Sequence, residues 1–352
     1  MNRELVDLTT EHFDLVIVGA GIHGATLALA SVKAGYSVAL IEQGDFGHST
    51  SANSLKIIHG GIRYLQHGDL KRMRESIVSR REMMRFAPHL VKPLACMMPT
   101  YGHGIKGRET MRLAFGLYDI VAWDRNDGLP KQNHLPRGGS ISREEVRWVV
   151  PGIKEDGLTG GAVWYDGIAE STERLVLEYL LEARRYGARV LNYVQAKSVN
   201  SLRGSVLGLT ASDLVTGEPL EISARLVINA AGPWLEQLGE KLAPIADQLW
   251  TTAVNIVVKK RLFKKFAVGL EGRSEYKDKD AIIRRGKRLF FFVPWQDDYT
   301  MIGTTYTSYR GTADGFRLGR EDVENIVEEI NRKLNIAKKR STNVLGGFCG
   351  FY

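Results

Sequence analysis

Two apolar runs separated by a glycine-rich turn form the first clear pattern of the chain. Residues 15–18 are apolar, small residues follow as far as Lys33, and residues 36–41 form a second run that ends at Glu42. Short continuous apolar runs are typical of strands buried on both faces of a parallel sheet. The pattern therefore predicts a strand, a helix closed at Ala34-Gly35, and a second strand.

Helical and extended patterns follow along the rest of the chain. Asp69 is a good N-cap for a helix that carries Leu70, Met73 and Ile77 on one face and ends before Pro88. Residues 88–157 carry many glycine and proline loop signals. Further helices are predicted over 172–186 and from 321 to about 334, and strands over 189–194, 206–213, 222–229, 252–258 and 281–305.

The turn between the first two apolar runs has the spacing G-x-G-x-x-G. Gly19 permits a tight turn, Gly21 lets a pyrophosphate approach the backbone, and Gly24 lets helix and strand pack closely. Glu42, after the second strand, is placed to accept hydrogen bonds from ribose hydroxyls. We therefore predict a dinucleotide site whose remaining contacts include Ile22, His23 on the pyrophosphate side, and Gln43.

Residues 49–65, STSANSLKIIHGGIRYL, discriminate between dinucleotides. The stretch has neither the alternation of a half-buried strand nor the period of a packed helix. Its small polar side chains suit a long cofactor such as FAD, whereas nicotinamide dehydrogenases usually continue into regular β-α-β units. We interpret Gly60 and Gly61 as the place where the chain passes the flavin ring. The predicted contacts along the flavin half are Thr50, Ser51, Ser54, Leu55, Lys56 and Ile57.

The stretch TSANSLKIIHGGIRYLQHGDLK resembles the family of FAD-dependent glycerol-3-phosphate dehydrogenases, within the D-amino-acid-oxidase-like flavoproteins. ARLVINAAGPWLEQL resembles the second flavin motif of that family and implies contacts from Ala231, Gly232 and Trp234. The resemblance also implies that the adenine meets the backbone near Ala196. FAPHLVKPL and RLFFFVPWQDDYTMIGTTY resemble two further family segments.

The resemblance implies an α/β fold with two interleaved domains. A Rossmann-like FAD-binding domain is expected over 12–75 and 158–238, and an α+β substrate domain with an antiparallel sheet over 76–157 and 239–352. Two later family segments, the rest of S-G-x-R-P-L and G-G-K-x-T-T, are absent after LGGFCGFY. We therefore expect the chain to be a fragment.

The implied chemistry is oxidation of a secondary alcohol, with sn-glycerol 3-phosphate the first choice of substrate and quinone the electron acceptor. Arg63 is the leading candidate for substrate contact because a guanidinium can pair with a phosphate in a bidentate manner. Tyr64 is a candidate hydrogen-bond donor and His59 a candidate base, although packing or loop-holding roles stay open for both. A hydroxy acid or an amine as substrate, and a non-catalytic flavoprotein, also stay open.

Two positions depart from the family pattern. Asn255 stands at the place of a family histidine, and Tyr352 stands at the place of the phosphate-binding arginine. Asparagine cannot act as a base near neutral pH, and tyrosine offers one neutral donor in place of a charged fork. These two positions put the identity of the substrate in question.

Composition adds limits to this picture. The net charge is +8, with basic clusters at 259–265, 284–288 and 338–340, and there are two cysteines. The clusters are most simply explained as solvated surface, and attraction to an anionic substrate or an anionic membrane surface is the functional alternative. Without regular aromatic residues among them we expect no nucleic acid. We predict no metal site. We expect a cytoplasmic protein that attaches peripherally to the inner face of the membrane, and a homodimer stays open.

Overall fold

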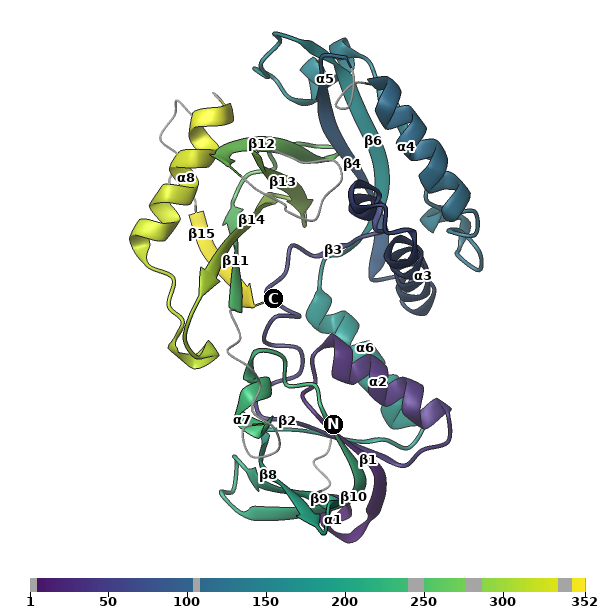
Figure 1. Cartoon of the computed structure of the whole chain (residues 1–352), viewed down its shortest axis with the longest axis vertical. Helices are drawn as coiled ribbons and strands as arrows, with labels where there is room; N and C mark the ends of the chain where they lie inside the picture. Colours follow the sequence, from purple (N-terminus) through teal and green to yellow (C-terminus); the bar gives the residue numbers. More distant parts are fainter. Residues whose placement is uncertain (1–4, 104–107, 240–249, 276–286, 335–343, 352) are drawn as a thin grey trace.

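The structure, a computed structural model, describes the chain except for residues 1–4, 104–107, 240–249, 276–286, 335–343 and 352. Two β-sheets organise it, a smaller one in the lower half of Figure 1 and a larger one in the upper half. The smaller sheet takes strands from residues 12–42 and 189–229, and the larger from residues 57–169 and 250–351. Each sheet is therefore assembled from two separated stretches of the chain.

The smaller sheet has the strand order β7-β2-β1-β10-β9-β8. Strand β1 pairs in parallel with β2 and β10, and β2 with β7, whereas β9 lies antiparallel to both β10 and β8. The strands are β1 (His12–Val18), β2 (Val38–Glu42), β7 (Arg189–Asn192), β8 (Val194–Leu202), β9 (Ser205–Asp213) and β10 (Pro219–Asn229).

Two helices, α2 (Ile22–Lys33) and α6 (Thr172–Arg185), lie side by side against the smaller sheet (Figure 1). Ala25, Ala28 and Leu29 of α2 share one core with Leu175 and Leu180 of α6. Alanine side chains let the helix axis come close to the sheet, so the helix N-terminus is held at the carboxyl end of β1.

The larger sheet has the order β15-β11-β14-β13-β12-β4-β6-β3, and β5 pairs with β6. Among the described residues, the strand pairs of this sheet are antiparallel except for that of β12 with β4. The strands are β3 (Ile57–Ile58), β4 (Val91–Tyr101), β5 (Gly139–Ile141), β6 (Leu158–Ala169), β11 (Trp250–Val258), β12 (Ala267–Glu275), β13 (Lys287–Trp295), β14 (Tyr299–Tyr309) and β15 (Val344–Phe351).

Helices α3 and α4 cover the outer side of β4 and β6 (Figure 1). The side chain of Asp69 caps α3 by accepting a hydrogen bond from the Arg72 amide at 2.9 Å, as the sequence predicts. The helices outside the α2–α6 pair are α1 (Leu5–Thr10), α3 (Leu70–Phe86), α4 (Arg108–Val121), α5 (Arg143–Val149), α7 (Leu235–Gly239) and α8 (Arg320–Leu334). Short 3-10 helices are η1 (Ile62–His67), η2 (Lys131–Asn133), η3 (Gly232–Trp234) and η4 (Ala313–Gly315).

The predicted α/β class is confirmed, and helices α2, α3, α6 and α8 lie within a residue or two of their predicted bounds. Among the longer elements, helix α4 and strands β4, β6, β8 and β12 were not predicted. Helix α4 is hydrophobic on both a buried face (Phe115, Tyr118) and an exposed face (Leu113, Ile120), which blurs the helical period. Part of the predicted strand over 281–305, and Tyr352, lie outside the described residues, and the division into domains stays a prediction.

A carboxylate joins α3 to the end of α4. The Asp124 side chain, 5% exposed, accepts hydrogen bonds from Arg74, with Nη2 to Oδ2 at 2.6 Å, and from Arg81. The hydrogen bond to Arg74 lowers the pKa of Asp124 to about 2 against the opposing effect of burial. The pair of arginines therefore holds this carboxylate charged and locks the two helices together.

Replacement of this carboxylate should weaken the fold. We expect Asp124→Asn to lower the free energy of unfolding by about 2 kcal/mol, because two charged hydrogen bonds lose their acceptor charge. Since the folded pKa lies below the unfolded one, the contribution is full above about pH 4 and is lost as the pH falls through about 2. Urea unfolding midpoints at neutral and acid pH measure both effects. The control is Asp156→Asn, whose carboxylate is 88% exposed; an equal loss in the two variants would contradict the assignment.

Candidate cofactor and active site

The glycine-rich turn lies between β1 and α2, and two of its glycines are required by the protein's own packing. Gly19 has φ +106°, and a Cβ there would lie 2.5 Å from the Ala230 carbonyl oxygen. A Cβ on Gly24 would collide with the Gly19 carbonyl oxygen. These two glycines therefore bring strand, turn and helix into contact, as the motif predicts.

Gly21 is different. Its φ of −74° suits any residue, and a Cβ there would meet only the Ser51 Oγ, at 3.2 Å, a close contact that a small shift of this side chain would relieve. Ser51 Oγ accepts a hydrogen bond from the Ile22 amide at 2.9 Å, and His23 is exposed beside it. Close approach of a pyrophosphate to the N-terminus of α2 explains a glycine that the protein contacts do not require.

Glu42 ends β2 with its side chain almost fully buried. Its Oε2 accepts from the Ala20 amide and its Oε1 from the Gly44 amide, both at 2.8 Å. A carboxylate oxygen has a second lone pair, so the Glu42 side chain retains acceptor capacity for ribose hydroxyls. Gln43, the next residue, accepts from Gln195 at 3.4 Å, which brings the segment before Ala196 on β8 to the same edge.

The loop over residues 49–57 contains one orphaned buried group. Thr50 Oγ1 is buried and has no hydrogen-bond partner within the described part of the chain. A buried hydroxyl without a partner is costly, and a cofactor lying along the loop would satisfy it. The orphaned Thr50 hydroxyl and the open Gly21 backbone both fit bound FAD.

Lys56 has a structural partner in the same loop. Its backbone is left-handed, with φ 62°, and its ammonium, 5% exposed, donates to Glu173 at 3.1 Å and to Thr172 Oγ1 at 2.9 Å. The charge therefore ties the loop to the start of α6. Ser54 Oγ accepts from the Lys56 amide at 3.3 Å, and Leu55 and Ile57 pack on an apolar cluster of the larger sheet.

The second predicted flavin motif lies directly against the first. Strand β10 ends at Asn229, whose side chain accepts from the Ala231 amide at 3.2 Å and donates to the Leu235 carbonyl at 2.9 Å. Gly232 starts η3 with φ +56°, and Trp234 Nε1 donates to Asp314 at 2.7 Å. Because the Ala230 carbonyl faces Gly19, two motifs that are far apart in sequence form one surface.

Two glycine substitutions separate cofactor binding from folding. We expect Gly21→Ala to leave the fold intact but to weaken FAD binding at least about tenfold, because the added methyl group fills the space for the pyrophosphate. Gly24→Ala should instead destabilise the whole protein by displacing the Gly19 carbonyl. Flavin absorbance after gel filtration and the thermal midpoint of the apoprotein measure the two effects. Full flavin retention by a folded Gly21→Ala protein would contradict the assignment.

The residues proposed for catalysis follow β3. His59, with 59% of its side chain exposed, and the half-buried Tyr64 line a cavity of about 410 Å³ together with Arg72, Glu75 and Arg80 of α3. Ile58, Ser76, Ser79 and Met83 complete the lining. The exposed Arg63 lies in η1 next to Tyr64 and is not among the residues that line this cavity.

A buried carboxylate, which sequence reasoning missed, holds this segment. Asp166 of β6 is 1% exposed, and its Oδ1 accepts from the Gly60 amide at 2.7 Å and from Arg80 Nη1 at 3.0 Å. Its Oδ2 lies 3.1 Å from His59 Nδ1 and 3.2 Å from Trp164 Nε1. An aspartate inside the apolar run GAVWYDGIA was a signal of such a buried network.

The two glycines of this segment also have a packing role. A Cβ on Gly60 would collide with the Arg80 guanidinium and the Tyr118 hydroxyl. Gly61 has φ +76°, and its Cβ would lie 2.8 Å from Ser76 Cβ. The contacts of α3 and α4 thus explain both glycines, whereas their predicted position beside the flavin ring stays a prediction.

Asn255 lies in an irregularity of β11, between residues that pair in different registers with β14. It is 1% exposed, and a Cβ on Gly303 would collide with its Oδ1. Within the described residues, this Oδ1 and the nearby Thr305 Oγ1 have no hydrogen-bond partner. Asn255 is therefore a packed polar residue of the larger sheet, with no basic group to offer.

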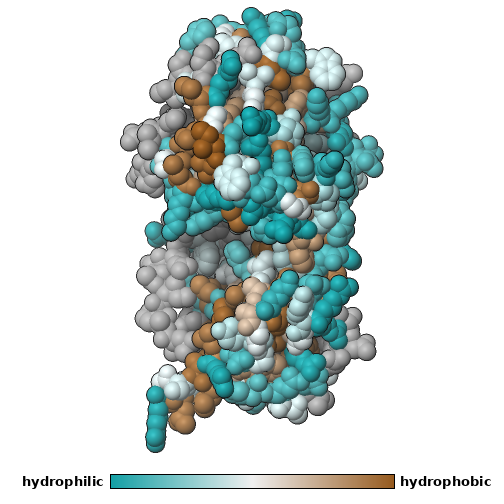
Figure 2. All heavy atoms as spheres, turned by 90° about the vertical axis from the view of Figure 1, so that its right-hand side faces the viewer, coloured by the Kyte–Doolittle hydropathy of each residue, from teal (hydrophilic) through white to brown (hydrophobic). Residues whose placement is uncertain are grey.

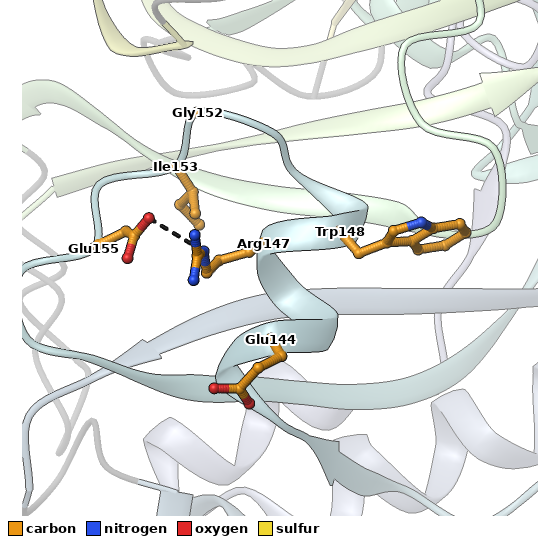
Figure 3. A pocket seen from close by; sticks show the side chains of 6 residues that line it. All are labelled: Glu144, Arg147, Trp148, Gly152, Ile153 and Glu155. Carbon is orange, nitrogen blue, oxygen red and sulfur yellow. Dashed lines mark ion pairs between the residues drawn. The ribbon is translucent and has the colours of Figure 1, made fainter.

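A second cavity, of about 330 Å³, lies at α5 (Figure 3). Arg147 pairs with Glu155 at 3.1 Å across it, and Trp148 points the other way, 73% exposed. None of the predicted site residues lines this cavity. We therefore assign the candidate site to the turn, the loop over 49–57 and the segment over 59–64.

The parallel strands, the glycine turn at a helix N-terminus and the buried acid define a dinucleotide-binding protein of the Rossmann type. The FAD dependent oxidoreductase (DAO) family matches residues 14–352, and the chain belongs to this family. FAD as the cofactor, predicted from residues 49–65, is thereby confirmed.

Relatives of known name agree with this family. The chain is 29% identical to the glycerol-3-phosphate dehydrogenase of Synechocystis sp., over 99% of this chain and 62% of that protein. It is 32% identical to the alpha-glycerophosphate oxidase of Streptococcus pyogenes serotype M1, over 96% of this chain and 53% of that protein. The chain thus spans between half and two thirds of the length of these relatives.

A solved structure shares the fold. The glycerol-3-phosphate dehydrogenase from Bacillus halodurans complexed with FAD superposes with a TM-score of 0.74 at 24% identity, over 99% of this chain and 58% of that chain. At this level of identity the likeness shows the fold alone. The predicted Rossmann-like and antiparallel-sheet architecture is confirmed.

Proposed function

We propose that the protein oxidises sn-glycerol 3-phosphate to dihydroxyacetone phosphate. The observation that carries the proposal is the cavity lined by His59 and Tyr64, two residues that come after the cofactor loop in the sequence, with the exposed guanidinium of Arg72 in its wall. The relatives, a glycerol-3-phosphate dehydrogenase and an alpha-glycerophosphate oxidase, support the same substrate. The wall also holds Glu75, and the buried Arg80 is paired with Asp166, so the exposed positive charge in the wall that can attract a phosphate is that of Arg72.

Bound FAD supplies the acceptor for the hydride that leaves the alcohol carbon, so the alcohol loses two electrons and the flavin gains them. The chain itself orients the substrate and takes the hydroxyl proton. In this proposal Arg63 pairs with the phosphate, Tyr64 donates a hydrogen bond to the substrate, and His59 accepts the proton.

Other substrates remain candidates because Asn255 and Tyr352 replace two residues of the family pattern. A hydroxy acid is the second candidate, since its carboxylate needs only one cationic partner and Tyr352 stands where the family has a second arginine. An amine is the third. These candidates differ in charge and in the bond that is oxidised, so direct flavin reduction separates them.

Anaerobic reduction of the holoprotein tests the substrate. We expect glycerol 3-phosphate to bleach the flavin absorbance, and glycerol, lactate and an amino acid to do so at least about tenfold less efficiently because they lack the phosphate contact. Arg63→Ala should raise KM for glycerol 3-phosphate about ten- to a hundredfold, the loss of one charged hydrogen bond of about 1.5–3 kcal/mol. Arg203→Ala, in an exposed turn between β8 and β9, is the control. Bleaching by lactate but not by glycerol 3-phosphate would reject the first choice.

We also propose that the electrons pass to quinone at an anionic membrane surface. Within the described residues no helix is both long and apolar enough to cross a bilayer. Helix α4 supports attachment to such a surface because its outer face carries a stripe of exposed apolar residues, and Figure 2 shows hydrophobic atoms gathered in the upper half of that side. On the helix the stripe consists of Leu113, Leu117 and Ile120, exposed by 77, 43 and 71%, and Trp123, 76% exposed, lies in the turn just after the helix.

Vesicle binding tests the surface. We expect co-sedimentation with vesicles that contain phosphatidylglycerol, and weaker binding as salt screens the basic cluster over 259–265. Paired Leu117→Ser and Ile120→Ser substitutions should abolish binding by removing apolar contact with the bilayer. Leu207→Ser, at a comparably exposed leucine of β9, is the matched control. Binding that survives the paired substitution would exclude α4 as the contact, and a concentration-dependent mass would indicate a homodimer instead.

A further inference from the structure

The imidazole of His59 has an asymmetric environment. Its Nδ1 lies 3.1 Å from Oδ2 of the buried Asp166, whereas 59% of the side chain remains exposed at the cavity. The two ring nitrogens lie on opposite sides of the imidazole, so Nε2 lies away from the carboxylate. Nδ1 is therefore hydrogen-bonded to a buried group of the protein, whereas Nε2 is not engaged by that carboxylate.

The state of Asp166 decides which nitrogen carries the proton. Its two oxygens accept from the Gly60 amide, from Arg80 Nη1 and from Trp164 Nε1, all of which can only donate. Burial raises the pKa of Asp166, but the hydrogen bond and charge of His59 and the charge of Arg80 lower it below its ordinary value. An ionised carboxylate can only accept, so the fourth partner, His59 Nδ1, must be the donor.

Arg80 explains why this charge is tolerated inside the protein. It is 1% exposed, and besides Asp166 it donates to the Tyr165 carbonyl at 2.8 Å. Its Nε and Nη2 are buried without partners among the described residues. Because only Nη1 of this buried guanidinium makes hydrogen bonds, Arg80 is stabilised mainly by the opposite charge of Asp166. In turn, the charge of Arg80 keeps the Asp166 carboxylate ionised.

We propose that Asp166 is a positioning residue that holds His59 in the Nδ1–H tautomer, so that Nε2 is the acceptor for the substrate hydroxyl proton. The inference rests on the proposed function for the identity of that proton, but the tautomer does not depend on it. Because Asp166 also binds the Gly60 amide, the same carboxylate sets where η1 begins, and with it the position of Arg63 and Tyr64.

The tautomer can be measured directly by ¹⁵N NMR of the histidine-labelled holoprotein, with the His59 signals assigned from their loss in His59→Asn. We expect the Nδ1–H form in the wild type. In Asp166→Asn the amide oxygen should remain with Gly60 and Arg80, which turns the amide NH₂ toward His59 and selects the Nε2–H form. A wild-type protein in the Nε2–H form overturns the proposal, and this measurement does not depend on the folding of any variant.

Flavin reduction by glycerol 3-phosphate gives the second readout. We expect Asp166→Asn and His59→Asn each to lower kcat about 100-fold with KM unchanged. The double variant should be no slower than either single one, within about twofold, because Asp166 acts through His59. Asp124→Asn, which removes another buried carboxylate held by arginines, should keep both the tautomer and kcat. Additive losses in the double variant would reduce Asp166 to a folding role and reject the proposal.

The two failures are distinguishable. If glycerol 3-phosphate does not reduce the wild-type flavin, the proposed substrate is wrong, and the kcat comparison is made with whichever compound of the panel bleaches it. If the flavin is reduced but His59 is found as Nε2–H, the substrate stands and the role assigned to Asp166 is wrong.

Discussion

The ion pair between Asp166 and Arg80 is the constraint on which the candidate active site depends. It connects the middle of β6 to the inner face of α3, and its carboxylate fixes the backbone where β3 leads into η1. Removing one partner of a buried pair typically costs about 3–5 kcal/mol, because the remaining charge stays uncompensated. The segment that carries His59, Arg63 and Tyr64 therefore has little freedom to move independently of the larger sheet.

The local features of the cofactor site could be predicted from the sequence. The turn with Gly19 and Gly24 is visible because backbone geometry requires glycine at fixed spacing, and buried parallel strands give apolar runs that need no partner to be seen. The alignment of both flavin motifs on one surface, with the Ala230 carbonyl against Gly19, is what the family resemblance leads one to expect.

The remaining features depend on partners that are distant in sequence. The place of Lys56 beside the cofactor stays a prediction, and the sequence did not indicate that its ammonium bonds to Glu173, 117 residues later. The place of Gly60 beside the flavin ring also stays a prediction, and the neighbours that exclude a side chain there belong to α3 and α4. Helix α4 was not predicted because apolar residues on its exposed face, as well as on its buried face, remove the amphipathic pattern by which a helix is recognised. No single-residue pattern encodes such contacts.

The crowding around Gly60 has a consequence for sequence variation. Any side chain at this position would occupy the space of the Arg80 guanidinium and the Tyr118 hydroxyl, while loss of Arg80 would leave the Asp166 charge without its counterion. A single substitution at one of these positions therefore leaves either a steric clash or an unpaired buried charge. We expect positions 60, 80, 118 and 166 to covary, so that divergent homologues either keep all four residues or have replaced them together.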